Sequence, residues 1–170
     1  MRKMLLLILV APLCMFGQDF ITITESEYAG FTETAVPAYK AEIIRVGKKE
    51  YMDSWAKFLT SRSDAKIVRT DDNITIEKAV LKNIRTNPMN IYMHFEDMEN
   101  GTRVFFAFED TVSGFIRPDD SKYGVALKGL ILDRSREVFM EVKKGDLAAE
   151  EKHLKKLEDE LDDVKDDQDK

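Results

Sequence analysis

Ile91-Tyr-Met-His-Phe-Glu-Asp-Met98 is followed by Glu99-Asn-Gly101 and then by Thr102-Arg-Val-Phe-Phe-Ala-Phe108. Large apolar residues alternate along both outer runs, as is typical of strands with one buried face. Asn-Gly tolerates the positive φ angles of a type I′ turn, so we expect a tight hairpin with Phe95 opposite Phe106. The stretch therefore predicts an antiparallel sheet that has one apolar face.

The chain before this hairpin predicts one strand, one helix and two further strands. The strands are expected over residues 41–46, 65–69 and 74–81. The helix is expected over residues 48–61, where large apolar residues recur at spacings of three and four. These residues are Tyr51, Met52, Trp55, Phe58 and Leu59. They should face the core, although an aromatic ligand stripe would show the same spacing.

Beyond the hairpin the sequence predicts two helices separated by Gly145. Asp119 or Asp120 can cap the first, which begins near Ser121. The second contains a short heptad seam and should fray beyond Val164, because like charges repeat there. The seam residues are Leu147, Leu154, Leu157, Leu161 and Val164. The expected fold is a two-layer α+β domain, with helices on one face of an antiparallel sheet in the order strand, helix, four strands, helix. A charged amphipathic C-terminal helix follows.

The N-terminus has the pattern of a secretory signal peptide. Two basic residues precede the uncharged apolar run of residues 4–16, which is shorter than the roughly 20 residues of a membrane span. We expect cleavage near Gly17 and Gln18, and hence a periplasmic or secreted protein. A buried N-terminal helix is the alternative. We expect the domain boundaries to be 1–17 for the signal, 18–38 for an extended segment, 39–145 for the α+β domain and 146–170 for an acidic helical extension.

Cys14 is the only cysteine, and it lies inside the predicted signal. Lipid attachment at this residue would anchor the protein, but bacterial lipidation signals place a small residue before the cysteine, whereas Leu13 stands there. We therefore expect soluble export without lipidation, and no transmembrane segment.

The acidic charge of the chain is concentrated at its end. The whole sequence has 26 basic and 32 acidic residues, and its formal charge is −6. Residues 146–170 alone contain 11 acidic and 5 basic side chains. Nucleic-acid binding needs a surplus of basic residues on one face, so this balance argues against a nucleic-acid partner.

Catalytic motifs are absent from the sequence. It has no Walker loop, dinucleotide fingerprint, nucleophile elbow or His-Glu-x-x-His motif. We therefore expect no enzyme activity, no metal site and no cofactor. One speculative patch, which could hold an unfamiliar acid/base site if it lies in a cleft, is on the outer side of the hairpin. It consists of Tyr92, His94, Glu96 and Glu109.

Several features together resemble a group of small exported proteins of Bacteroidetes-type bacteria. They are Tyr51-Met-Asp-Ser-Trp55-Ala-Lys-Phe58-Leu59, the Asn-Gly hairpin, Pro118 with Tyr123, and Glu151-Lys-His-Leu-Lys-Lys-Leu-Glu158. The resemblance covers roughly residues 40–165, and Gln18-Asp19 is similar to the mature N-terminus of such proteins. It implies export and the α+β architecture, and no activity is carried over from it.

Two main hypotheses follow for function. The first is a non-enzymatic envelope protein whose C-terminal helix pairs with itself or with another protein. The alternative is a binding module that holds a small apolar or lipid-like ligand between sheet and helices. The side chains that would face such a ligand are Trp55, Phe58, Phe95, Phe106 and Phe108.

Overall fold

The computed structural model describes residues 20–61 and 65–168. The predicted signal peptide, Cys14 and Gln18-Asp19 lie outside these residues. The elements are β1 (Ile21–Tyr28), β2 (Val36–Ile44), α1 (Lys48–Thr60), β3 (Ile67–Arg69), β4 (Asn73–Ala79), β5 (Met89–Met98), β6 (Gly101–Asp110), β7 (Gly114–Phe115) and α2 (Gly124–Gln168).

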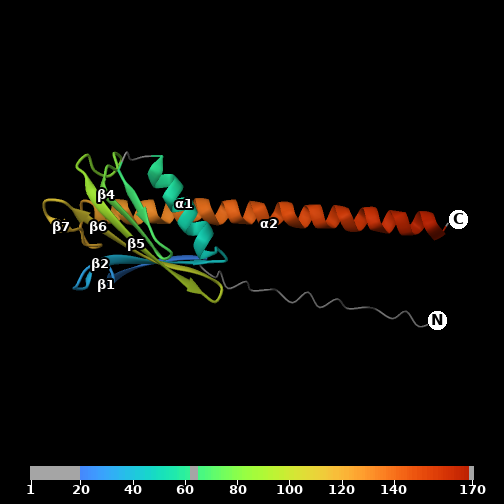
Figure 1. Ribbon diagram of the computed structural model, residues 1–170, viewed down its shortest axis with the longest axis horizontal. Coiled ribbons are helices and arrows are strands. Elements are labelled where there is room, and N and C mark those ends of the chain that lie inside the picture. Colours follow the sequence, from blue (N-terminus) through green and yellow to red (C-terminus); the bar gives the residue numbers. More distant parts are fainter. Residues whose placement is uncertain (1–19, 62–64, 169–170) are drawn as a thin grey trace, which may run out of the picture.

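The strands form one antiparallel sheet in the order β1-β2-β6-β5-β4-β3, and β7 pairs with the end of β6. Both helices cover the same face of this sheet, while α2 extends far beyond it (Figure 1). The predicted α+β class is confirmed. Trp55 of α1 is 1% exposed and its ring lies 5.1 Å from that of Phe106. Tyr51, Met52 and Leu59 are buried with it, so these four residues of the α1 stripe belong to the core, whereas Phe58 is only partly buried.

The β5–β6 hairpin has a different register from the predicted one. Phe95 is opposite Val104, and Met98 is opposite Gly101, so the turn residues are Glu99 and Asn100. Within the described residues positive φ values occur at Arg45, Lys78 and Gly114, which excludes a type I′ turn.

The neighbouring strand β2, and not the turn, requires a glycine at position 101. A Cβ atom there would lie 2.1 Å from the carbonyl oxygen of Ile43 in β2. The absence of a side chain thus lets the hairpin end close against β2. The slip relative to the prediction is two residues, so each side chain still lies on its predicted face.

The N-terminal segment is part of the sheet, contrary to the expected domain start near Tyr39. β1 pairs with β2 along its whole length, from Ile21 opposite Ile43 to Tyr28 opposite Val36. Ring contacts also attach the start of this hairpin to α2, where Phe20 lies 5.2 Å from Phe139. The observed order is therefore two strands, a helix, five strands and a helix.

The predicted break at Gly145 is wrong, because α2 is one helix of 45 residues. It also continues past Val164, where fraying was expected, to Gln168. Gly145 has no atom within 4 Å of the position that a Cβ would take, so nothing packs against this site. The propensity cost of one glycine, about 1 kcal/mol, is too small to interrupt a helix rich in Ala, Leu, Glu and Lys.

Polar contacts fix the first half of α2 on the body. The Asp120 carboxylate accepts from the backbone N–H groups of Lys122 and Tyr123, so it caps the turn that leads into α2. The helix itself begins at Gly124, three residues later than the predicted start at Ser121. The Tyr39 hydroxyl donates to the Gly124 carbonyl at 2.7 Å. Farther along, the hydroxyls of Tyr51 and Ser135 are 2.6 Å apart in the core. The direction of α2 is thus set by its buried half.

Candidate interaction surface

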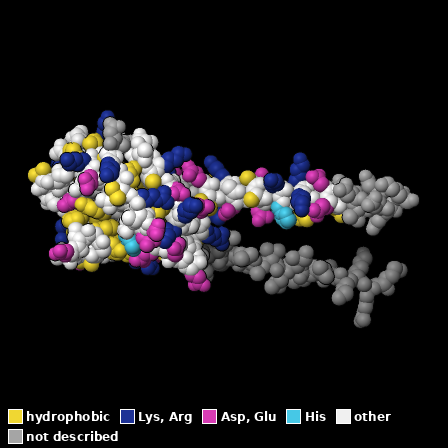
Figure 2. Space-filling model, viewed as in Figure 1, with side chains coloured by type: hydrophobic (Ala, Val, Ile, Leu, Met, Phe, Trp, Pro, Cys, Tyr) yellow, Lys and Arg dark blue, Asp and Glu magenta, His cyan; other side chains and the backbone are white. Residues whose placement is uncertain are grey.

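The second half of α2 leaves the body and has no packing partner within the described part of the chain. Every residue from Lys144 to Leu161 is exposed. These residues span roughly 27 Å at the rise of an α-helix. Figure 2 shows this part as a thin projection, with apolar and charged side chains on its surface, next to a compact body.

Four leucines form an apolar stripe on this projection, and we call them the seam. Leu147 and Leu154 are each 60% exposed, Leu157 is 49% exposed and Leu161 is 56% exposed. Large apolar side chains so exposed, and aligned on one helix, are a usual mark of an interaction site. Val164 continues the spacing in the sequence, but its side chain lies outside the described residues.

The seam lies on the side of α2 that faces away from the body. The first half of the helix buries Leu127, Ile131 and Val138 against the sheet. At 100° per residue, the four seam residues lie roughly 100–180° around the axis from Val138. The body therefore does not obstruct a helix that approaches the seam.

Two charged edges flank the seam, and they differ in how far their charges are paired. With Leu147, Leu154 and Leu161 at a positions, one edge has Lys144 at the e position next to the body and the carboxylates of Glu151 and Glu158 at the following e positions. Neither carboxylate makes an ion pair with the described side chains, which are those of residues 20–61 and 65–161. We call these two residues the open edge.

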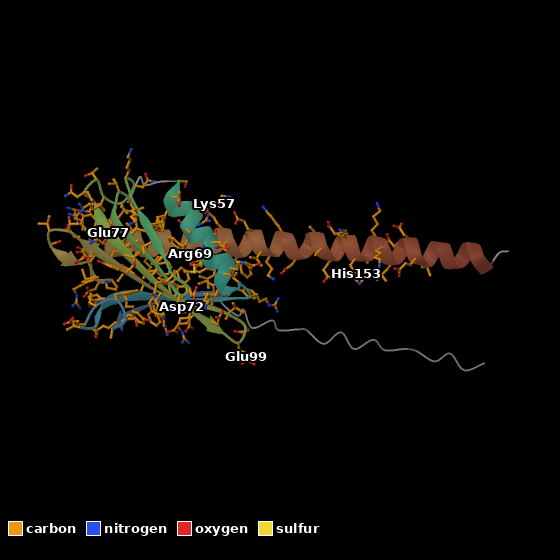
Figure 3. All side chains as sticks on the ribbon, viewed as in Figure 1. Lys57, Arg69, Asp72, Glu77, Glu99 and His153 are labelled. Carbon is orange, nitrogen blue, oxygen red and sulfur yellow. The ribbon has the colours of Figure 1, made fainter. Side chains whose placement is uncertain are left out.

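The g edge is largely neutralised within the helix. Asp146 pairs with Lys143 at 2.5 Å, and Glu160 pairs with Lys156 at 3.1 Å. The remaining g residue is His153, which projects from α2 well beyond the body (Figure 3). The strongest unpaired charge beside the seam is therefore on the open edge.

The structure distributes the speculative patch over two hydrogen-bonded groups. In the first, the Tyr92 hydroxyl and the Asn90 amide both donate to Glu109 Oε2 at 2.8 Å. Burial, together with the Glu109 carboxylate, raises the pKa of Tyr92 to about 12, so the phenol is protonated at neutral pH.

The second group of the patch surrounds His94. Its Nδ1 lies 2.9 Å from Asn73 Oδ1, and its Nε2 lies 3.7 Å from Glu96 Oε1. Glu96 also accepts from Arg103 at 3.2 Å. These side chains are thus engaged with one another across neighbouring strands.

Aromatic rings pack on the outer sheet face, beside the polar side chains of the patch. The Tyr28 ring stacks 4.4 Å from Phe105 and 5.1 Å from His94, and Phe31 packs 5.7 Å from Tyr92. A Cβ on Gly30 would lie 2.4 Å from the Tyr28 ring, so this glycine lets the chain fold closely over the face. The loop after β1 therefore covers part of the patch with aromatic rings and forms a second small core.

The proposed space between sheet and helices is filled by side chains. Trp55, Phe95, Phe106 and Phe108 are all 1% exposed or less. Phe58 instead lines a half-open groove of about 360 Å³ at the end of α1, together with Leu81, Ile84 and Leu130. Its volume falls in the lower range of ligand pockets. If the protein binds a small apolar ligand, the groove beside Phe58 offers space for it, and the interface between sheet and helices does not.

No protein-family model, curated protein or solved structure matches the chain. Neither α1 nor α2, the helices of the described residues, has the length and apolar character needed to cross a membrane. In the same residues, no three His, Asp or Glu side chains are grouped closely enough to hold a metal ion. The function must therefore be argued from the geometry of the chain.

Sequence reasoning found the seam residues but not the side of the molecule on which they lie. Two helices separated at Gly145, as the sequence predicted, have no fixed angle between them. The prediction therefore could not relate the buried stripe of the first half to the seam. The signal that could have recovered it was the helix-favouring composition on both sides of that glycine. The covering role of Tyr28 and Phe31 had no comparable signal, because it depends on a long-range ring contact.

Proposed function

We propose that this protein is a non-enzymatic interaction module that binds another protein through the seam of α2. The observation that carries the proposal is the four half-exposed leucines on the side of the helix opposite its packed face. A helix with such a stripe binds by laying its apolar residues against those of a partner helix or groove. The first half of α2, packed on the sheet, would hold the binding half at a fixed position.

Site-specific photo-cross-linking in the native cell tests the proposal. A photoreactive residue at Leu154 should give a defined protein adduct, and the same residue at Lys152, on the other side of the helix, should not. Leu157→Gln should remove the adduct from position 154, because it places a polar group in the apolar contact. Equal adducts from positions 154 and 152, or none from either, would contradict the proposal.

We also propose that the protein acts outside the cytoplasm as a soluble envelope protein. The support is the basic start and apolar run of residues 1–16, followed by Gly17. The mass of the protein recovered from its cell should correspond to a chain that begins at Gln18. A lipid-modified chain beginning at Cys14 would instead place the module on a membrane surface, and an uncleaved chain would contradict export by this signal.

The groove beside Phe58 supports a second candidate function, the binding of a small apolar or lipid-like ligand. Lipid extraction and mass spectrometry of protein purified without detergent should then show about one ligand per chain. Leu130→Trp, which fills the groove, should lower this amount. Val125→Trp is the matched control, because Val125 lies on the same helix and is 74% exposed. No ligand, or equal amounts in both variants, would remove this candidate.

A further inference from the structure

We infer that the seam binds a different protein's helix, which has Lys or Arg along the edge that faces Glu151 and Glu158, and not a second copy of this chain. The inference rests on the function proposed above and deepens it by naming the chemistry of the partner. It is carried by the distribution of paired and unpaired charges around the seam.

The unpaired carboxylates of the open edge are the first reason to expect a basic partner helix. Glu151 and Glu158 lie two turns apart on one side of the seam, and no described residue pairs with either. Residues at e positions contact the flanking residues of a partner helix and thereby select it. Two unpaired carboxylates in line with the seam therefore favour basic side chains on the facing helix.

The lysines of the projection offer little of this complement to a second copy. Lys144 occupies an e position at the base of the projection, whereas Lys152, Lys155 and Lys156 occupy the f, b and c positions, on the side of the helix away from the seam. The seam side thus presents mainly carboxylates, although the projection has charges of both signs.

A parallel pair of identical helices would give the open edge no basic partner. The open edge would face the g edge of the other copy, so that Glu151 meets Asp146, whose carboxylate is already paired with Lys143, and Glu158 meets His153. Glu150 occupies a d position within the seam and would face its own counterpart. A buried pair of carboxylates is strongly unfavourable without a cation between them.

An antiparallel pair also leaves carboxylates facing each other. In that arrangement e positions face e positions, so Glu151 of one copy approaches Glu158 of the other. One heptad away Lys144 reaches Glu158, but Glu151 then faces its own counterpart. A basic partner avoids both conflicts, and a single Lys or Arg opposite Glu150 would also set the register of the pair.

Two synthetic peptides of three heptads test the inference with the full chain. Both have Leu at a and d, and they differ in having Lys or Glu at every e and g position. Fluorescence anisotropy of each labelled peptide, titrated with the protein, should show that the Lys peptide binds more tightly and that high salt weakens it. Equal binding of the two peptides, or no binding of either, would overturn the inference.

Adjacent charge reversals separate the open edge from general attraction to an acidic helix. Glu158→Lys should weaken binding of the Lys peptide roughly three- to tenfold, the range expected when exposed charge pairs change from attraction to repulsion. Asp159→Lys makes the same charge change at an f position and should alter it less than about twofold. Equal weakening by both variants would overturn the inference.

Two further measurements distinguish its failure from that of the proposed function. If Leu154→Gln abolishes binding of both peptides while Glu158→Lys has no effect, the seam is an interaction site but the partner is not selected by charge. If Leu154→Gln changes nothing, the proposed function itself fails. Sedimentation velocity of the protein alone should show a monomer, and a concentration-dependent dimer that Leu154→Gln disrupts would identify a second copy as the occupant.

Discussion

The two halves of α2 have apolar stripes on opposite sides of one helix. In the first half, Leu127 and Ile131 are completely buried against the sheet. In the second half the same side of the helix continues with Ala149 and Lys156, while leucines emerge on the other side. The leucine stripe of the second half therefore does not extend the core of this domain.

The halves also differ in their attachment to the rest of the chain. Arg134, in the first half, donates to Ser54 of α1, and its guanidinium carbon lies 5.3 Å from the centre of the Phe58 ring. Beyond Lys144 the ion pairs of the described side chains are internal to the helix, such as that of Lys156 with Glu160. One half therefore contributes to the stability of the domain, and the other is available for binding.

Truncating one apolar residue in each half of α2 should give the largest difference in stability between the two halves. Ile131→Ala should lower the free energy of unfolding by about 2–5 kcal/mol, because it leaves a cavity in the core. Leu154→Ala should change it by less than about 0.5 kcal/mol, because this side chain is solvent-exposed. Urea unfolding measures both values. An equal loss in Leu154→Ala would mean that the seam is already packed in the free protein.

The same substitution at two glycines should have opposite effects in the two halves. A Cβ on Gly124 would lie 2.3 Å from the Pro118 carbonyl oxygen, so Gly124→Ala should cost about 1–3 kcal/mol. Gly145→Ala meets no neighbouring atom and should favour the local helix by up to about 1 kcal/mol. Thermal unfolding should detect the first change, and the helical signal in circular dichroism the second. Destabilisation by Gly145→Ala would show that its neighbourhood is occupied.

Lowering the pH should weaken the attachment of the first half of α2, with a smaller effect on stability than the substitutions above. Hydrogen bonds from Ser113 and the Val112 N–H, with an ion pair to Arg85, lower the pKa of Asp110 to about 2. Arg85 also lies over the Tyr123 ring just before α2.

The sign of the acid effect follows from this lowered pKa. The stabilisation by Asp110 is fully present above the unfolded-state pKa of about 4 and is lost as the pH falls through about 2. Urea unfolding at several pH values should show a shallower loss between pH 4 and 2 in Asp110→Asn than in the unmodified chain. Parallel curves would contradict this role of Asp110.

The sheet face was predictable because its signal is local. Alternation along β5 and β6 assigns each side chain to a face, and the two-residue error in register leaves Phe95 and Phe106 on the apolar one. The turn type was not predictable, since Gly101 is required by its approach to Ile43, a residue far away in the sequence.

The seam was predictable as a list of residues but not as a surface. Spacing gives the relative positions of Leu147, Leu154 and Leu161, whereas their direction depends on how Tyr39, Tyr51 and Arg134 hold the first half of α2. Such contacts join residues that are about 80 positions or more apart. No periodicity within the helix reports them.

Because α2 continues without a break across Gly145, the position and direction of the seam are fixed relative to the buried half of the helix. Each residue between the buried Val138 and the seam adds about 1.5 Å of length and about 100° of rotation. One alanine inserted after Gly145 would leave composition, charge and helicity almost unchanged, yet it would turn the entire leucine stripe by more than a quarter of a circle. The number of residues between the body and the seam therefore sets the direction in which the seam faces as well as its distance from the body.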